Sequence, residues 1–408
     1  MQKLSVFGAS LLVAGTCIGA GMLAIPIVTA ASGYYLSVAL FFAVWSMMTA
    51  TAYLMLEVSL WFKGEENLIS MAEATLGKPG KIIAGVSYVV FLYALMTLYT
   101  SGGSEIFYDV LNSFLPGIFS LELAICLYVM IFGSLVYLGT KAVDTFNRVL
   151  ILGLVLAYSL LVAYVTPNVN IDLIAAGQAK YLFLAVPVLV TSFGFHLLIP
   201  SLKYMMGFDL RQLRLAILYG SFIPMLVYLV WEFVVLGTIP MYGDVSMHVI
   251  AQSKQPVLQL TNALDNLVKG HGVSFVIRFF TFFAIVSSFI GVSLGLFDFL
   301  ADGTKMAKQG MSRVSLVMMT FFPATIFSIL WPGKFLVILG YAGIFASVLL
   351  IIFPSMMVIT GRYFSKSSNF SSEYKVSGGV LLPVVTLCFG ILVILIEIFK
   401  HCGYLPSF

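Results

Sequence analysis

A glycine-rich segment near the start of the chain has the composition of a helix that can be interrupted. Residues 13–26 place Gly15, Gly19 and Gly21 close together and follow them with Pro26. Glycine lowers helix propensity by about 1 kcal/mol relative to alanine, and proline removes a backbone donor. An interruption would free backbone N–H groups at the start of a half-helix, where the helix dipole favours an anion such as a carboxylate.

Close packing is the alternative explanation of the same glycines. Gly15 and Gly19 have the small-xxx-small spacing that lets two helices approach closely within a membrane. The residues alone leave interruption and packing equally open.

A second segment, residues 186–200, repeats the combination of glycine, proline and polar side chains. Gly194 lies between Pro187 and Pro200. Its polar neighbours are Thr191, Ser192 and His196. A histidine within an apolar span is expensive enough to suggest a function, although a structural histidine bonded to a backbone carbonyl is an equal alternative.

The overall composition is that of a membrane protein. Of the 408 residues, 61% are hydrophobic and only 9% are charged, whereas a soluble domain carries roughly 25% charged residues. The net charge of +4 includes no basic run, so no nucleic-acid partner is expected. The four cysteines and four histidines are scattered, without metal-ligand spacing, and no catalytic motif is present. We therefore expect neither an enzyme nor a metal site.

Apolar stretches long enough to cross a membrane predict an all-α protein with about eleven transmembrane helices. The predicted spans are 6–31, 36–62, 82–108, 122–140, 149–166, 182–201, 215–239, 275–299, 314–331, 335–358 and 379–400. The longest predicted loops are 63–81 and 240–274. The two glycine-containing segments fall in spans 1 and 6, five spans apart. Interrupted helices at corresponding positions of two repeats indicate a transporter binding site.

The distribution of basic residues predicts the orientation. With the N-terminus inside, 15 of the 21 Lys and Arg residues lie on the cytoplasmic side and 6 on the outer side. The outer ones are Lys180, Lys254, Lys269, Arg278, Lys334 and Lys400. The positive-inside rule then places the C-terminus outside.

The remaining polar residues of the spans have less specific patterns. Glu57, Asp298, Glu105, Glu232 and Arg278 fall toward span ends, where an interfacial or paired charge is the simpler explanation. Glu105 stands out because it follows the small, polar residues 101–104. The hydroxyls of Ser287 and Ser288 have the chemistry of small-cation ligands, or they bond to their own helix or a neighbour. Phe193 and Phe195 flank the second segment, where they either stack on an aromatic ligand or pack.

At these segments the chain resembles the hydroxy and aromatic amino acid permease family, within the class that shares the LeuT-type fold. The resemblance runs over essentially the whole chain. Its motifs are AGTCIGAGMLAIP (14–26), LEV (56–58), DTFNR (144–148), TSFGFH (191–196) with Pro200 and Ser201, SSFIGV (287–292), GLFDFLAD (295–302) and LGYAG (339–343).

This resemblance implies a five-plus-five inverted repeat with broken helices 1 and 6 and an eleventh helix. The first repeat would cover about 6–166, the second about 182–358, and the extra helix 379–400, all in one transport domain, 1–408. It also implies proton symport, with no bound organic cofactor and no obligate protein partner. The substrate carboxylate would meet the backbone around Gly19, Ala20 and Gly21, and the amino group would meet freed carbonyls and hydroxyls near residues 192–194.

The residues expected to bind substrate are Thr16, Gly19, Ala20, Gly21, Met22, Thr191, Ser192, Phe193, Gly194 and Phe195. The candidates for ion coupling are His196, Glu105, Ser287 and Ser288. One departure from the family is the bulky run 197–199, where smaller or polar residues are frequent.

We therefore expect an importer of an aromatic amino acid in a bacterial inner membrane, with tyrosine as the first candidate substrate. The alternatives are a sodium-coupled symporter, in which Ser287 and Ser288 bind the ion, and a permease for tryptophan or a small hydroxy amino acid. A membrane enzyme or channel is the alternative from another class.

Overall fold

The computed structural model describes residues 3–64, 66–175, 177–268, 273–364 and 374–406. In this part of the chain all regular structure is helical. The helices of the first half are α1 (Val6–Cys17), α2 (Gly21–Thr29), α3 (Tyr34–Leu60), α4 (Leu68–Phe114), α5 (Leu121–Leu138), α6 (Thr140–Val165), η1 (Thr166–Asn168) and α7 (Ile171–Ala175). Those that follow are η2 (Ala179–Ala185), α8 (Val186–Ser192), η3 (His196–Leu198), α9 (Ile199–Met205), α10 (Leu210–Leu236), α11 (Met247–Gln252), α12 (Pro256–Leu267), α13 (Val273–Thr304), α14 (Gly310–Leu330), α15 (Phe335–Ser347), η4 (Val348–Ile352), α16 (Phe353–Ile359), η5 (Thr360–Phe364) and α17 (Leu381–His401).

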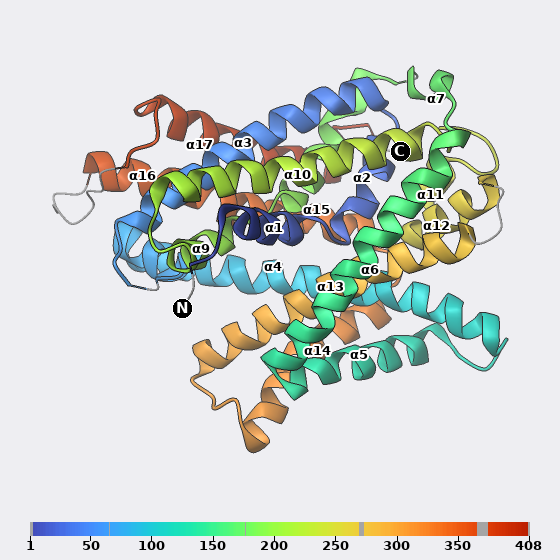
Figure 1. The fold of residues 1–408 in the computed structure, drawn as a ribbon, viewed down its shortest axis with the longest axis horizontal. Helices are drawn as coiled ribbons and strands as arrows, with labels where there is room; N and C mark the ends of the chain where they lie inside the picture. The colour runs from blue at the N-terminus through green and yellow to red at the C-terminus, as the bar shows by residue number, and fades with distance from the viewer. Residues whose placement is uncertain (1–2, 65, 176, 269–272, 365–373, 407–408) are drawn as a thin grey trace.

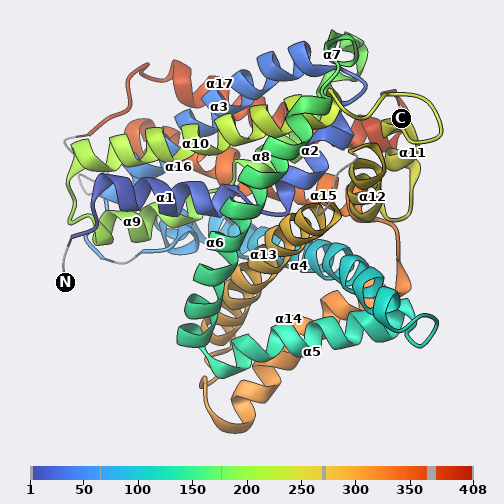
Figure 2. The ribbon, with the colours of Figure 1, turned by 45° about the vertical axis from the view of Figure 1, so that its right-hand side comes forward.

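The prediction of eleven spans is confirmed. Ten helical segments of the described residues are long and apolar enough to cross a membrane, and α1 with α2 forms an eleventh that is bent by 58°. The two termini lie at opposite ends of the long helices (Figures 1 and 2), as an odd number of crossings requires. Two of the lysines used in the loop count, Lys269 and Lys366, lie outside the described residues.

The prediction of two long loops, 63–81 and 240–274, was wrong, because both ranges contain helix. Helix α4 begins at Leu68, capped by the Asn67 side chain, and is broken at Gly77, whose φ of +74° favours glycine. The polar residues around Gly77 hid this first part from a search for apolar stretches. Helices α11 and α12 occupy the second loop, and α12 buries one apolar face against α13, α2 and α4 while its other face stays polar.

Helix α4 connects two groups of helices. It contacts α5, α13 and α14 on one side and α15 and α16 on the other. Figures 1 and 2 both show α5 beside α14, and α1 beside α10. The approach of α1 to α10 needs a glycine, because a Cβ at Gly220 would lie 2.5 Å from the Cβ of Val13. Small residues that allow such approaches are typical of helix interfaces in membranes.

A buried ion pair fixes α3 to the end of the tenth span. Arg362 Nε and Nη2 donate to the two oxygens of Glu57 at 2.7 and 2.5 Å, and both side chains are almost fully buried. Val376 N also donates to Glu57 at 2.7 Å, and Arg362 Nη1 donates to Gly379 O at 2.8 Å. The charges are thus neutralised and their hydrogen-bonding capacity is used. The expectation that Glu57 is a paired charge is confirmed.

Replacing one member of this pair should destabilise the fold. In Glu57→Gln, Arg362 stays buried without its counter-charge, which costs about 3–5 kcal/mol. We expect a lower thermal unfolding midpoint for the purified protein in detergent. The control is Asp144→Asn, which removes an exposed pair with Arg148 and should leave the midpoint unchanged. Equal midpoints for the two variants would contradict the stabilising role of Glu57.

Candidate functional site

The first transmembrane span is interrupted between α1 and α2. Helix α1 ends at Cys17, Ile18 takes an extended conformation with ψ of 101°, and α2 begins at Gly21. Gly15 has no heavy atom within 4 Å of an added Cβ, so the glycines do not form a continuous packing stripe. Of the two explanations of this segment, interruption of the helix is confirmed.

Ser288 of α13 fills the space beside the interruption. A Cβ at Gly19 would lie 2.3 Å from Ser288 Oγ, so a side chain there would force the Ser288 hydroxyl out of its position. Ser288 Oγ accepts from Ala20 N at 3.0 Å and donates to Ala284 O at 2.9 Å. The donor and one of the two acceptor sites of the Ser288 hydroxyl are therefore occupied.

The sixth span is interrupted between α8 and α9. Helix α8 ends at Ser192, residues 193–195 leave the helix, and the short η3 leads into α9. Pro187 and Pro200 lie in the first turns of α8 and α9, where a missing N–H costs nothing. A Cβ at Gly194 would come within 2.8 Å of Thr191 O. The predicted second interruption is confirmed.

The two interruptions meet face to face. A Cβ at Gly21 would lie 3.0 Å from Ser192 Oγ, so the start of α2 touches the end of α8. The hydroxyl of Tyr228, on α10, is 2.7 Å from Cys17 O and 3.0 Å from Ser192 O, the last carbonyls of α1 and α8. Three half-helix ends therefore meet, one with positive and two with negative partial charge.

This arrangement has the chemistry to hold a zwitterion. The N–H groups of Gly19 and Gly21 make no hydrogen bond to the described residues, whereas that of Ala20 is already bonded to Ser288. Free N–H groups at a helix start bind a carboxylate, and carbonyls at helix ends attract an ammonium group. Of the three backbone groups expected to meet the carboxylate, two are therefore available in this conformation.

Two aromatic residues at the interruptions were not predicted from the sequence. Tyr228 and Trp231 both lie on α10, and Trp231 Nε1 donates to Met22 O at 3.1 Å. A tyrosine or tryptophan in an apolar span usually needs a polar partner, but the sequence holds too many of them for that rule to select these two.

The side chains predicted to contact the substrate differ in burial and in their hydrogen-bond partners. Phe193 and Phe195 are buried, and the Phe193 ring lies edge-on to Tyr228 with centroids 5.2 Å apart. Thr191 Oγ1 donates to Pro187 O within its own helix. Thr16 lies on the exposed face of α1, where its hydroxyl bonds to carbonyls of the same helix.

His196 has the contacts of a structural histidine. It is completely buried, and its Nε2 lies 2.8 Å from Thr51 Oγ1 on α3. The Thr51 hydroxyl also lies 3.0 Å from Met48 O. Since that hydroxyl has a single proton to donate, Nε2 is best assigned as the donor to Thr51, and Nδ1 has no partner among the described residues.

The other predicted coupling residues bond within their own helices. Ser287 Oγ donates to Ala284 O at 3.2 Å, and Glu105 accepts from Ser101 at 3.3 Å, four residues earlier in α4. The expectation of an interfacial or paired charge is confirmed for Arg278, which bonds to Asp109, and for Asp298, which lies 2.7 Å from Lys308. It is wrong for Glu105 and Glu232, which are buried and for which the described residues provide no cationic partner within 4 Å. No group of residues with metal-ligand geometry occurs in the described ranges.

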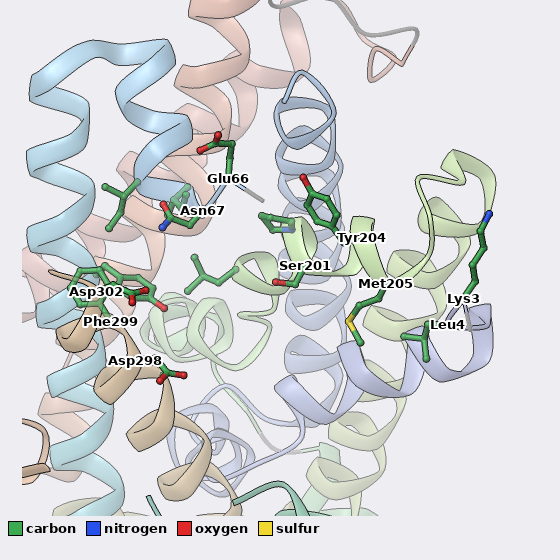
Figure 3. Close-up of a pocket in the computed structure, with 16 residues that line it drawn as sticks. Lys3, Leu4, Glu66, Asn67, Ser201, Tyr204, Met205, Asp298, Phe299 and Asp302 are labelled. Carbon is green, nitrogen blue, oxygen red and sulfur yellow. The ribbon is translucent and has the colours of Figure 1, made fainter. Parts of the chain in front are cut away.

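A cavity of about 780 Å³ is lined by Lys3 and Leu4, next to the N-terminus. Leu197 and Pro200, just after the interruption of span 6, also line it. Figure 3 shows Asp298, Phe299 and Asp302 of α13 on one side of the cavity and Tyr204, Met205 and Lys3 on the other. The cavity thus reaches span 6 just beyond its interruption, and residues 19–21 and 192–194 are not among its lining residues.

Comparison with known proteins supports the same interpretation. Residues 2–397 match the tryptophan/tyrosine permease family. The chain is 33% identical over 409 residues to tyrosine-specific transport system 2 of Haemophilus influenzae, covering 100% of this chain and 99% of the relative. It is 32% identical to the tryptophan-specific transport protein of the same organism, covering 99% and 98%.

A solved structure has the same fold. The crystal structure of MhsT in complex with L-phenylalanine matches with a TM-score of 0.66 over 97% of this chain and 99% of that one, at 16% identity. The predicted LeuT-type fold is therefore confirmed.

A larger side chain at Gly19 should abolish transport. Gly19→Leu places carbon atoms where Ser288 Oγ lies and so displaces the α2 start from α13. We expect loss of uptake of radiolabelled tyrosine into cells, with the variant still present in the membrane. Gly15→Leu, which points into open space, is the matched control and should keep uptake. Full activity of Gly19→Leu would refute the site.

Removing the Tyr228 hydroxyl should weaken the site without changing its volume. Tyr228→Phe leaves Cys17 O and Ser192 O without their buried donor, at a cost of about 1–3 kcal/mol. We expect a KM for uptake raised by roughly 5- to 150-fold. Tyr158→Phe removes a comparable bond from α6 to Val227 O on α10, which involves neither interrupted span, and should leave KM unchanged. An unchanged KM in Tyr228→Phe would mean that its hydroxyl does not shape the site.

Proposed function

We propose that this chain, which belongs to the tryptophan/tyrosine permease family, imports an aromatic amino acid by proton symport, with tyrosine as the first candidate. The chain is a multi-pass membrane transporter rather than an enzyme, as its family and relatives are. The choice of tyrosine is supported by the 33% identity to a tyrosine-specific transport system. The tryptophan-specific relative, at 32%, makes tryptophan the second candidate.

The observation that carries this proposal is the meeting of the two interrupted spans. The substrate carboxylate binds the N–H groups of Gly19 and Gly21 at the start of α2, and the ammonium group binds carbonyls near Ser192 and Gly194. Phe193 and Phe195, beside the same interruption, provide the apolar surface for an aromatic side chain. No cofactor takes part.

The position of the cavity supports alternating access. Its lining reaches Leu197 at the interruption and opens on the face that carries Lys3. With 15 of the 21 basic residues counted on that side, this face is cytoplasmic and the conformation faces inward. The two repeats, about 6–166 and 182–358, rock against each other so that the site opens alternately to each side.

The coupling ion is a proton in this proposal. Of the two serine hydroxyls that would bind sodium, Ser288 Oγ already accepts from Ala20 N at 3.0 Å, which uses one of the two lone pairs that an ion would need. This engagement favours a structural role for Ser288.

Uptake of radiolabelled tyrosine into proteoliposomes tests the proposal. With an inwardly directed proton gradient and no sodium, we expect accumulation that a protonophore abolishes, because the gradient is its only energy source. Excess unlabelled tyrosine should compete, whereas serine should not. Liposomes with the Gly19→Leu variant are the matched control and should accumulate nothing.

Each other result would change a specific part of the proposal. Uptake only in the presence of sodium would replace the proton by sodium at Ser287 and Ser288. Competition by tryptophan alone would reassign the substrate. Equilibration without accumulation would exclude symport.

A further inference from the structure

The membrane-spanning helices contain four completely or almost completely buried glutamates. They are Glu57, Glu105, Glu232 and Glu397. Glu57 is paired with Arg362, and Glu397 with Lys400 at 3.2 Å. Within the described residues, Glu105 and Glu232 have no lysine, arginine or histidine within ion-pairing distance, and each has one oxygen without a hydrogen-bond partner. An ionised carboxylate in such surroundings is strongly disfavoured.

Of these two carboxyl groups, only that of Glu232 bonds to an interrupted helix. It lies on α10 and bonds to the hydroxyl of Thr29, the last residue of α2. Glu105 bonds to Ser101 of its own helix, and that contact does not change when helices move apart. The Glu232 contact, in contrast, exists only while α2 lies against α10.

Counting protons at Thr29 indicates the state of Glu232. The single proton of the Thr29 hydroxyl faces two groups, since Oγ1 lies 2.7 Å from Ile25 O and also bonds to Glu232 Oε1. A carbonyl accepts only, and so does an ionised carboxylate, so with an ionised Glu232 the two contacts would have to share one proton. A protonated Glu232 gives each contact its own proton, because it donates to Thr29 while Thr29 donates to Ile25 O.

The described surroundings of Glu232 contain other hydroxyls but no positive charge within ion-pairing distance. Helix α10 packs against α1, α2, α3, α6 and α7. The hydroxyls of Ser32 and Ser37, at the turn from α2 into α3, bond to each other and to nearby carbonyls. The phenol of Tyr34, on α3, is a titratable group near Glu232. None of these groups supplies a cation that would hold the carboxylate ionised.

We propose that Glu232 binds the symported proton. In its protonated form it holds α2 against α10 in the conformation in which the substrate site is closed to the side of the membrane opposite the cavity. This inference rests on the proposed function, because it assigns the proton of that symport to a residue. When Glu232 loses the proton, the buried negative charge favours separation of α2 from α10, which admits water. Protonation is thereby linked to the position of the half-helix that begins at Gly21.

The test compares Glu232→Gln with Glu105→Gln in proteoliposomes. Glutamine mimics a protonated carboxyl that cannot release its proton. For Glu232→Gln we expect preserved counterflow, the exchange of labelled for unlabelled tyrosine without a gradient, and complete loss of accumulation driven by a proton gradient. Counterflow by the wild type should slow as pH rises, because Glu232 must be protonated to close, whereas Glu232→Gln should be insensitive to pH. The matched control Glu105→Gln should behave as the wild type in all three measurements.

Two results for Glu232→Gln would overturn this inference. One is accumulation equal to that of the wild type, and the other is loss of counterflow as well as accumulation, which indicates a structural role.

A second measurement does not depend on transport. The infrared spectrum of the purified wild type should contain the C=O band of a buried protonated carboxyl, which Glu232→Gln removes and Glu105→Gln leaves. If the wild type neither accumulates nor exchanges tyrosine, the proposed function fails while this spectrum still decides the state of Glu232. Absence of a band specific to Glu232 would overturn the inference in every case.

Discussion

The structure depends on one constraint, that every backbone N–H and C=O within the apolar part of a membrane must find a partner in the protein. Two of the spans are interrupted and so release several of these groups at once. The partners come from other helices, with Ser288 bonding to Ala20 N and Tyr228 to the carbonyls of Cys17 and Ser192. The groups left over, the N–H groups of Gly19 and Gly21, are then the ones available to a ligand.

Helix α10 provides several of the side chains that bond to the interrupted first span. Its polar side chains reach the interrupted first span at three levels, with Tyr228 at the end of α1, Trp231 at the start of α2 and Glu232 at the end of α2. The first two bonds keep the released carbonyls satisfied. The third involves a group that can lose its charge by binding a proton. A single helix thus connects the candidate substrate site with the proposed proton site.

Other buried ionisable residues differ from Glu232 in that they are bonded to partners on other elements, and they hold the surrounding helices in place. Arg362 joins Glu57 on α3 to the loop before α17. Lys203, buried at the end of α9, donates to Ser59 O and Phe62 O at 2.7 and 2.9 Å and so caps the end of α3. Each of these cations is hydrogen-bonded to its partners. Loss of a partner would leave an unpaired charge in a medium of low dielectric. Movement is therefore expected where buried groups lack a charged partner, as at Glu232.

The sequence by itself determined the number of spans and marked the two segments that can be interrupted. Apolar length sets a span, and Gly19, Gly21, Gly194 and the prolines near them weaken a helix. Whether the glycines of the first segment interrupt the helix or serve close packing was decided by the structure. The sequence did not reveal α12, because polar residues on the outer face of this helix alternate with the apolar residues that it buries, so no long apolar run occurs. Only the tertiary structure decided which side chains meet the released backbone groups. Ala20 and Ser288 are 268 residues apart, and Tyr228 is 211 residues from Cys17. Such contacts depend on how each helix is rotated and tilted against its neighbours, and hydropathy along the chain carries no information about either. The same reason explains Glu232, which was expected to be an interfacial or paired charge at a span end, whereas the fold places it beside Thr29 with no cationic partner among the described residues.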